Sequence, residues 1–385
     1  MSPLNIQESF KRPKIWIVVF TGNSGLTHYS YCLARALKAA GNDVTLVTNR
    51  NYDLDEFGAD FPIIRVFGRT RRYPVDIISF WRLFLRERPQ IIHYQSFLKF
   101  PAAESILLKL QKRAGAKMVL TAHDWLPHSR RFYHAALYRR VYRLFDRIIV
   151  HSPAGLRFLS GELGVEPRKL SVIPHGHYGF FSTDRKLTAA AARELLGLDQ
   201  ERFWFLFFGR IDPHKGLDIA LRALAATEEC GPGKPPGLVI AGDPGAFSLE
   251  PYRRLIATLG LEDRVIMHPG HVPVEEIQVY FQAADAVVLP YRESSTSGIA
   301  HVAMGFDKPV VATAVGGLVD VVEDGATGLL VPAGDEKGLA QAMNRLANNT
   351  ETRTRLAEGW KGVREQYAWE TIARQTRDVY TEVAR

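Results

Sequence analysis

Cysteine is nearly absent from this chain of 385 residues, which contains only Cys32 and Cys230. One lies in a helical pattern and the other in a loop, so the pair predicts neither a disulfide framework nor the closely spaced ligands of a zinc site. This composition fits a reducing compartment, and we expect a cytoplasmic protein. No metal ion is expected, because no acidic DxD-type motif stands in a plausible place.

Long apolar runs are also missing. The first run, Ile15–Phe20, has the length of a strand, and nothing approaches the roughly 20 apolar residues of a membrane span. The first fourteen residues contain charges with no apolar core behind them, so they do not predict a signal peptide. The apolar fraction of 46% is that of a globular protein, and the length allows two domains.

Acidic residues are scarce in the first half of the chain. Up to Ser182 there are 27 Lys and Arg against 13 Asp and Glu, whereas the remainder has 22 against 28. This asymmetry indicates that one half faces an anionic partner, such as a lipid head-group surface, a phosphorylated acceptor or nucleic acid. Nucleic acid is the least favoured, because the basic residues are spread over several helices without a known reader motif.

The basic residues of the first half form three clusters. These are Arg69, Arg71 and Arg72; Lys109, Lys112, Arg113 and Lys117; and Arg130, Arg131, Arg139, Arg140, Arg143 and Arg147. In the third cluster, Tyr138, Val141, Tyr142 and Phe145 fall on one helical stripe. Such a stripe is typical of a helix at a membrane interface, or of an ordinary helix packed on a sheet with solvated arginines.

Apolar strand patterns alternate with helical patterns along the whole chain, which predicts an α/β protein with parallel sheets covered on both faces. We expect two Rossmann-like domains that face each other across a cleft. The first spans residues 1–180 and the second spans 184–364. A last amphipathic helix within 365–385 is expected to pack back on the first domain.

The run FFGRIDPHKG near the middle of the chain has the pattern of a phosphate site. An apolar strand ends at Gly209, Arg210 follows, and Lys215 stands just before an amphipathic helix. The glycine allows close backbone approach, and the guanidinium, the ammonium and the helix N-terminus favour an anion. A diphosphate is the ligand this run indicates; the alternative is a strand-to-helix turn with two solvated charges.

The turn after the first strand, TGNSG, contains Gly22 and Gly25, which allow a ligand to approach the backbone. It is not GxGxxG, and the second expected strand ends without an acidic residue, so a nicotinamide cofactor is not expected. An ordinary tight turn is the alternative.

The segment TAHDWLPH contains a candidate histidine. His123 follows a strand beside Asp124, with His128 nearby. We favour an acid–base or hydrogen-bonding role for His123; a structural histidine is the alternative.

Two further strand ends complete the candidate site. In YRESSTSGIA, Glu293 is placed to accept hydrogen bonds from sugar hydroxyls, and Ser297, Gly298 and Ile299 present backbone N–H groups at a helix start. A solvated carboxylate is the alternative for Glu293. The loop at Val272 has backbone groups that could line a cleft, or is a plain loop. All these segments follow strands, and ligands of parallel sheets bind at the carboxyl ends of strands.

These residues resemble a known family. GRIDPHKG, LVIAGDP, HPGHVPVEEIQVYFQAADAVVLPYRES and SGIAHVAMGFDKPVVATAVGG, in this order, are similar to segments of the family 4 retaining glycosyltransferases, which have the GT-B fold. The resemblance covers nearly the whole chain. It is strong from about Val172 to Gly334 and weaker before that.

The resemblance implies a role for each candidate residue. Arg210 and Lys215 would bind the donor diphosphate, with Gly209 beside them; Ser297, Gly298 and Ile299 would add backbone N–H groups; Val272 would hold the base; and His123 and Glu293 would contact the donor sugar. The family's Glu-x7-Glu motif is not intact here. Counting back from KPVVA places its two acids at Ser294 and Val302, and the position eight residues after Glu293 is His301.

The expected function is sugar transfer from a nucleotide-diphosphate sugar to an acceptor hydroxyl with retention, in cell-surface glycan, polysaccharide or glycolipid synthesis. The co-substrate is the nucleotide sugar and no other cofactor is expected. The partners are a glycan or lipid-linked acceptor and, through the basic first domain, an anionic membrane surface. The alternatives are a GT-B epimerase or phosphorylase and a non-catalytic nucleotide-sugar-binding partner.

Overall fold

The computed structural model describes residues 12–68, 70–95, 100–126, 134–183, 187–228, 233–294 and 297–385. Cys230, His128, Arg69, Arg130 and Arg131 lie outside these ranges. The chain forms two compact units. One comprises residues 1–150, 156–173 and 369–385, and the other comprises residues 151–155 and 174–368. Among the described residues, none of the helices has both the length and the hydropathy needed to cross a membrane.

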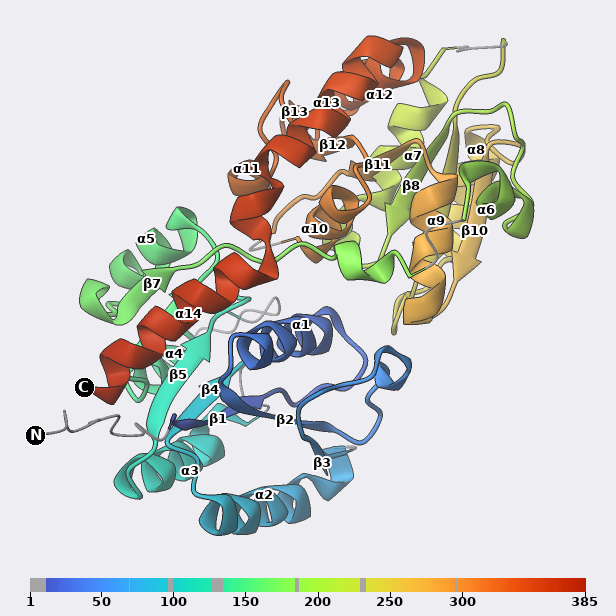
Figure 1. Cartoon of the computed structure of the whole chain (residues 1–385). Helices are drawn as coiled ribbons and strands as arrows, with labels where there is room; N and C mark the ends of the chain where they lie inside the picture. Colours follow the sequence, from blue (N-terminus) through green and yellow to red (C-terminus); the bar gives the residue numbers. More distant parts are fainter. Residues whose placement is uncertain are drawn as a thin grey trace, which may run out of the picture. The chain divides into compact units, whose positions relative to one another are not determined.

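The first unit contains a seven-stranded parallel sheet in the order β3-β2-β1-β4-β5-β6-β7. Its strands are β1 (Lys14–Val18), β2 (Asp43–Asn49), β3 (Ile63–Phe67), β4 (Ile91–Tyr94), β5 (Lys117–Thr121), β6 (Arg147–Val150) and β7 (Leu170–Val172). Its helices are α1 (Gly25–Ala39), α2 (Tyr73–Glu87), α3 (Pro101–Arg113), α4 (His134–Tyr142), α5 (Pro153–Gly161, whose first residues belong to the other unit) and α14 (Trp369–Ala384). Helix α1 covers one face of the sheet, whereas α2 and α3 cover the other (Figure 1).

The helix α4 packs into the core of this unit. The side chains of Tyr138, Val141, Tyr142 and Phe145 are at most 5% exposed and belong to the main hydrophobic cluster of the first sheet. The Tyr142 hydroxyl donates a hydrogen bond to the carbonyl of Trp125. The hypothesis that this aromatic stripe faces a membrane is therefore wrong, because its apolar surface is buried inside the protein.

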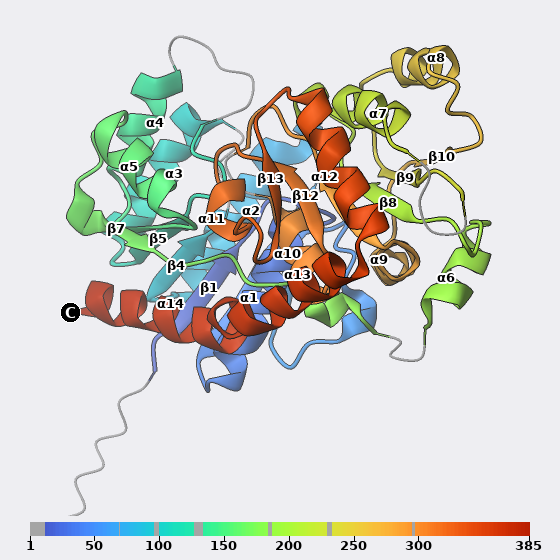
Figure 2. The same cartoon turned by 90° about the horizontal axis from the view of Figure 1, so that it is seen from above.

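The last helix, α14, lies beside α1 in both views (Figure 1 and Figure 2). It is fixed to the sheet by a buried polar chain, in which Nδ1 of His93 is 2.7 Å from the Tyr380 hydroxyl and its Nε2 is 2.7 Å from the Thr121 hydroxyl. His93 is fully buried, so both ring nitrogens need these partners. The final residues of the chain are therefore part of the first unit's core.

The second unit contains a six-stranded parallel sheet in the order β10-β9-β8-β11-β12-β13. Its strands are β8 (Trp204–Phe208), β9 (Gly237–Gly242), β10 (Val265–Pro269), β11 (Ala286–Leu289), β12 (Val310–Thr313) and β13 (Gly328–Val331). Its helices are α6 (Ala189–Leu195), α7 (Leu217–Ala225), α8 (Glu250–Thr258), α9 (Ile277–Ala283), α10 (Gly298–Gly305), α11 (Leu318–Val321), α12 (Glu336–Asn348) and α13 (Thr350–Val363). Two parallel sheets with helical crossovers confirm the expected α/β class.

Helices α12 and α13 were not among the expected elements, although the sequence signals both. The Asp335 carboxylate accepts a hydrogen bond from the backbone N–H of Gly338, and the Asn349 side chain accepts one from that of Thr352. Asp and Asn are preferred N-cap residues because their oxygens satisfy N–H groups that the first helical turn leaves unpaired. These two caps mark where the helices begin.

The carboxyl ends of β8 and β9 approach each other closely at two glycines. Gly242 has a φ of +144°, and a Cβ atom built on it would overlap the carbonyl oxygen of Gly209. Gly209 itself has a φ of +102° and donates its N–H to the carbonyl of Ala241 at 3.0 Å. Only a residue without a side chain fits at Gly242, since both the conformation and the space exclude a methyl group.

We expect Gly242→Ala to lower the free energy of unfolding by at least about 2 kcal/mol, which corresponds to a fall of roughly 5 °C or more in the melting temperature. Gly260→Ala is the matched control. Gly260 also has a positive φ (+64°), but nothing lies within 4 Å of the added Cβ, so its cost is about 1 kcal/mol. Thermal unfolding of both variants measures the difference. Equal melting temperatures would show that the close approach contributes nothing.

Candidate active site

The predicted phosphate turn lies at the carboxyl end of β8. After Gly209 the backbone continues along β9, where the N–H of Ile211 donates to the carbonyl of Asp243 at 3.0 Å. A Cβ atom on Gly209 would lie 3.3 Å from Cδ1 of Ile299. Two segments almost ninety residues apart, the glycine turn and the start of α10, are thus brought into contact in this unit.

Arg210 is held by its neighbour Asp212. The guanidinium donates from Nε and Nη2 to the two carboxylate oxygens, both at 3.1 Å, and the Arg210 side chain remains 65% exposed. Asp212 is largely buried. A bidentate pair of this kind fixes the plane of the guanidinium and leaves further N–H donors for a ligand.

Lys215 is positioned by an aromatic ring. Its Nζ lies 3.8 Å from the centroid of the Tyr291 ring, which is a favourable cation–π arrangement, and the ring is 1% exposed. The next residue, Gly216, has a φ of +69°, and a Cβ on it would overlap the carbonyl oxygen of Pro290. The lysine turn is therefore pressed against the loop that follows β11.

The start of α10 is joined to the same cluster. Ser297 is 2% exposed and is the N-cap of the helix; its hydroxyl accepts a hydrogen bond from the N–H of Ala300 and lies 3.4 Å from the Tyr291 hydroxyl. Tyr291 thus contacts both Lys215 and Ser297. With Gly298 and Ile299, Ser297 forms the first turn of α10, where backbone N–H groups and the helix dipole favour an anion.

Glu293 and Val272 lie in loops around this cluster. Glu293 is exposed between β11 and α10, and within the described part of the chain it forms no hydrogen bond or ion pair. Val272 is half-buried after β10, in a loop whose Gly270 donates its N–H to the carbonyl of Gly242 at 2.9 Å. The structure brings the Val272 loop to the end of β9, but it pairs Glu293 with no cation among the residues that it describes.

The remaining predicted residues belong to the first unit. His123 is 8% exposed; its Nε2 lies 3.1 Å from the Gln95 amide oxygen, and its ring packs edge-on against Tyr29 of α1 at 4.6 Å. Gly25 begins α1, and a Cβ on Gly22 would overlap Asn51 after β2. Gly22 and Gly25 therefore follow β1 and His123 follows β5, and the residues that they contact, Asn51 and Gln95, follow β2 and β4. That Gly22, Gly25 and His123 meet the second unit's cluster across a cleft stays a prediction.

His301 is a residue whose role the sequence did not indicate. It is fully buried on α10, and its Nδ1 donates to the carbonyl of Ser297 at 2.9 Å, which fixes the first turn of the helix from inside. Its ring packs 4.4 Å from His175 and 5.7 Å from Tyr367, and its Nε2 has no hydrogen-bond partner among the described residues. Burial lowers the pKa of His301 to about 3. The ring is therefore neutral at physiological pH.

Val302, where the motif count places the second acid, is 4% exposed. Neither Val302 nor the neighbouring His301 has a carboxylate, so these two positions offer no acidic side chain to a ribose hydroxyl. Within the ranges that the structure describes, no three His, Cys, Asp or Glu side chains gather in a way that could hold a metal ion.

The buried neutral His301 makes stability depend on pH. Below about pH 6.5 the unfolded chain takes up a proton at this histidine that the folded chain does not, so the free energy of unfolding falls as the pH is lowered. His301 alone should contribute about 1 kcal/mol of loss between pH 6.5 and 5.5, and about 1.4 kcal/mol for each further unit.

Urea unfolding at pH 7.5, 6.5 and 5.5 measures this loss. His301→Asn keeps a donor for the Ser297 carbonyl but does not titrate, so its stability should depend less steeply on pH than that of the unaltered protein. His271→Asn, at an exposed histidine of the same unit, should leave the pH dependence unchanged. The same slope in all three proteins would mean that His301 is protonated when folded.

Comparisons with known proteins were consistent for both units. Residues 23–177 match a family model described as "Glycosyltransferase Family 4", and residues 202–349 match one described as "Glycosyl transferases group 1". The chain is 37% identical over 197 residues to a D-inositol 3-phosphate glycosyltransferase of Streptomyces griseus, covering 50% of this chain and 42% of that protein. A protein of the same name from Nocardioides sp. is 34% identical over 246 residues, covering 61% and 53%. The chain spans about half the length of these relatives.

Two solved structures share the fold over nearly the whole chain. Sucrose-phosphate synthase from Thermosynechococcus elongatus superposes with a TM-score of 0.79 at 24% identity, covering 97% of this chain and 99% of the other. The Anabaena protein HepE, in complex with UDP-glucose, superposes with a TM-score of 0.78 at 20% identity, covering 96% and 100%. At these identities the likeness shows the fold alone, which is GT-B.

Proposed function

Because the chain belongs to the family 4 glycosyltransferases, we propose that it transfers a sugar from a nucleotide-diphosphate sugar to an acceptor hydroxyl with retained anomeric configuration. One observation supports this most strongly. Arg210, Lys215 and the first turn of α10 lie around one glycine-rich edge of the second sheet, joined through Tyr291 and Ile299. Two cations and a helix N-terminus suit a diphosphate.

The proposed chemistry uses these groups on the leaving diphosphate. As the bond between the sugar's anomeric carbon and the phosphate oxygen breaks, negative charge grows on that oxygen. The guanidinium of Arg210, the ammonium of Lys215 and the N–H groups of Ser297 to Ile299 would stabilise it. The acceptor oxygen forms the new bond on the same face of the sugar and passes its proton to the leaving phosphate oxygen, so no glycosidase-type carboxylate pair is needed.

The rest of the donor site follows from the loops around the diphosphate. The Val272 loop is tied to the end of β9 and would hold the base by its main chain. Glu293 is exposed and unpaired within the described chain, so it is available to sugar hydroxyls. His123 would approach the donor sugar from the first unit. The ribose would be bound without a carboxylate on α10, since Val302 and His301 stand there.

Lys215→Ala should lower the turnover number by two orders of magnitude or more, because it removes a charge that acts on the leaving group. Arg254→Ala is the control: Arg254 is an exposed arginine of the same unit, paired only on the surface of α8. Sugar release from a panel of nucleotide-diphosphate sugars, together with the melting-temperature rise that each donor produces, measures both variants. Full turnover in Lys215→Ala would refute the proposed site.

For the acceptor side, we propose that the first unit docks on an anionic lipid surface and works on a glycan or lipid-linked acceptor there. A surface over α2 and α3, here called the α2–α3 surface, supports this. Six of its large apolar side chains are between 39% and 64% exposed: Val75, Ile78, Leu85, Phe100, Ile106 and Leu110. Exposed apolar side chains gathered on neighbouring helices mark an interaction site.

The charges of the α2–α3 surface match such a partner. The acidic residues Asp76 and Glu104 on these helices are buried, and Glu87 is paired with Lys14. The exposed charged side chains of the two helices are basic: Arg82, Arg86, Lys109, Lys112 and Arg113. Two of them are ion-paired, Arg86 with Glu87 and Lys112 with Asp146. Exposed apolar side chains that share their helices with arginine and lysine favour the headgroup region of an anionic bilayer. The thiol of Cys32 is free and buried, which agrees with a cytoplasmic location.

Flotation with vesicles that contain anionic lipid should recover the protein at low salt and less of it at high salt, because attraction between charges is screened. The double variant Ile78→Asp, Ile106→Asp should lose most of this binding. Leu195→Asp, at a 69% exposed leucine of the second unit, is the control and should bind like the unaltered protein. Absence of binding at low salt would refute the membrane partner, and the proposed donor site would be unaffected by that result.

A further inference from the structure

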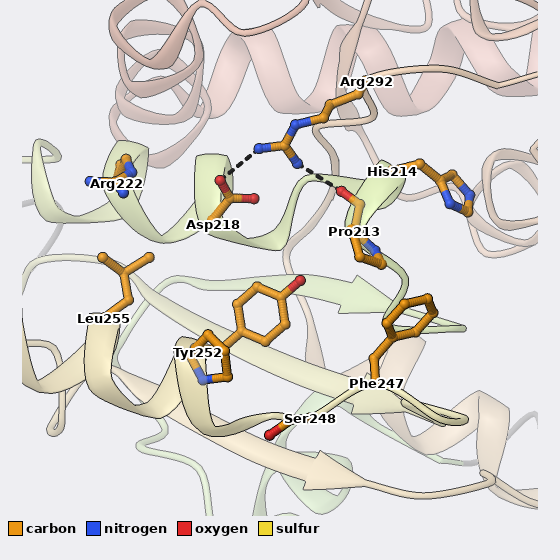
Figure 3. Close-up of a pocket in the computed structure, with 10 residues that line it drawn as sticks. Pro213, His214, Asp218, Arg222, Phe247, Ser248, Tyr252, Leu255 and Arg292 are labelled. Carbon is orange, nitrogen blue, oxygen red and sulfur yellow. Dashed lines mark hydrogen bonds and ion pairs between the residues drawn. The ribbon is translucent and has the colours of Figure 1, made fainter.

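A hollow of about 670 Å³ in the second unit has no role in the proposed transfer (Figure 3). Its walls come from the turn before α7 and α7 itself, from the loop after β9, from α8, and from the loop after β11. This volume is within the range of small-ligand sites and is large enough for more than one sugar ring.

One side of the hollow is apolar. Phe247 is 45% exposed, and the rings of Phe247, Tyr252 and Pro213 border the same space, with Leu255 further along α8 (Figure 3). An exposed phenylalanine costs free energy in water, and its ring offers a flat surface that an apolar ligand face can cover.

The other side is polar and internally paired. Arg292 donates from Nη2 to Asp218 at 2.6 Å and from Nη1 to the carbonyl of Pro213 at 2.7 Å. Burial opposes ionisation of Asp218, but the hydrogen bond and the positive charge of Arg292, together with a backbone hydrogen bond and the charge of Arg222, lower the pKa of that carboxyl. Arg222 is likewise paired, with Glu336 at 3.4 Å. Each arginine of the hollow is thus balanced by a carboxylate.

This balance decides the class of ligand. At the diphosphate cluster, Lys215 adds a further cation to the pair of Arg210 and Asp212. No lysine of the described chain lines the hollow, where Asp218 and Glu336 offset both guanidinium charges. A phosphate or nucleotide would therefore meet no net positive charge in the hollow and would be repelled by Asp218. A neutral polyhydroxylated ring avoids this cost. It can place hydroxyls on the remaining N–H donors of Arg292 and on the remaining acceptor sites of Asp218, and its C–H face on the aromatic rings. We propose that the hollow is a binding subsite for a pyranose ring of a neutral glycan.

The subsite is a neighbour of the donor site and separate from it. The backbone N–H of Arg292 donates to the carbonyl of His214 at 2.8 Å, which joins the two loops that continue into Glu293 and Lys215. A glycan held here would be anchored next to the loops that bind the donor. Its role as an acceptor subsite rests on the proposed function, whereas the binding itself does not.

The test measures binding of neutral disaccharides, maltose and cellobiose, to the full-length protein by saturation-transfer NMR and calorimetry, without any nucleotide. We expect dissociation constants on the order of millimolar for at least one of them. Phe247→Ala and Asp218→Asn should each weaken that binding at least about fivefold. Leu195→Ala, at an exposed leucine of the same unit, should bind like the unaltered protein. Thermal unfolding shows that the variants are folded.

Two further arms separate this proposal from the proposed function. Saturating UDP or GDP should leave disaccharide binding unchanged, and Lys215→Ala should still bind the disaccharide even though it no longer turns over. Competition by the nucleotides would overturn the proposal and assign the hollow to the donor. Absence of any disaccharide binding, or equal binding in Phe247→Ala and Asp218→Asn, would also overturn it.

Discussion

Backbone-to-backbone contact between loops shapes the carboxyl edge of the second sheet. At three places a glycine with a positive φ lies where a methyl group would overlap a carbonyl of another loop: Gly242 on Gly209, Gly216 on Pro290, and Gly316 on Ser294. Each contact joins segments that are distant in the sequence. The edge is therefore fixed by main chain, and the side chains around it need not pack to hold the loops in place.

This arrangement explains how both cations stay accessible. The Asp212 carboxylate aligns Arg210, and the Tyr291 ring, from the loop after β11, aligns Lys215. Both side chains are therefore held in place without being fully buried. Beneath them, His301 holds the first turn of α10 through the Ser297 carbonyl without bringing a charge into the core. Both positive groups thus remain accessible, and the neutral ring of His301 avoids the cost of a buried charge beside the start of α10.

The sequence predicted the fold class well because the strand and helix periods are clear and the glycines stand at strand ends. It also placed Gly209, Arg210 and Lys215 on one turn. It did not find α12 and α13, although Asp335 and Asn349 cap them, and it assigned the stripe of Tyr138 and Tyr142 to two possible environments. Periodicity shows that a helix has an apolar face; it does not show what covers that face.

The site was harder to predict than the fold. The Tyr291 ring that orients Lys215, and the buried His301, come from segments about eighty residues further along the chain, and no local pattern marks them. The exposed apolar residues of α2 and α3 could not be told from core residues by spacing alone. In the sequence, Ile78 and Phe80 look alike, but the first is 52% exposed and the second is buried. Only the packing of the sheet decides between them.

The Tyr380 hydroxyl that reaches His93 has a consequence for biosynthesis. The first unit needs residues 369–385 to finish its core, and these residues are synthesised after the whole of the second unit. The second unit, residues 174–368 with the short segment 151–155, is complete earlier on the ribosome. Until residues 369–385 have been synthesised, the first unit therefore lacks Tyr380 as a partner for His93, and the side of α1 that packs against α14 stays exposed to water.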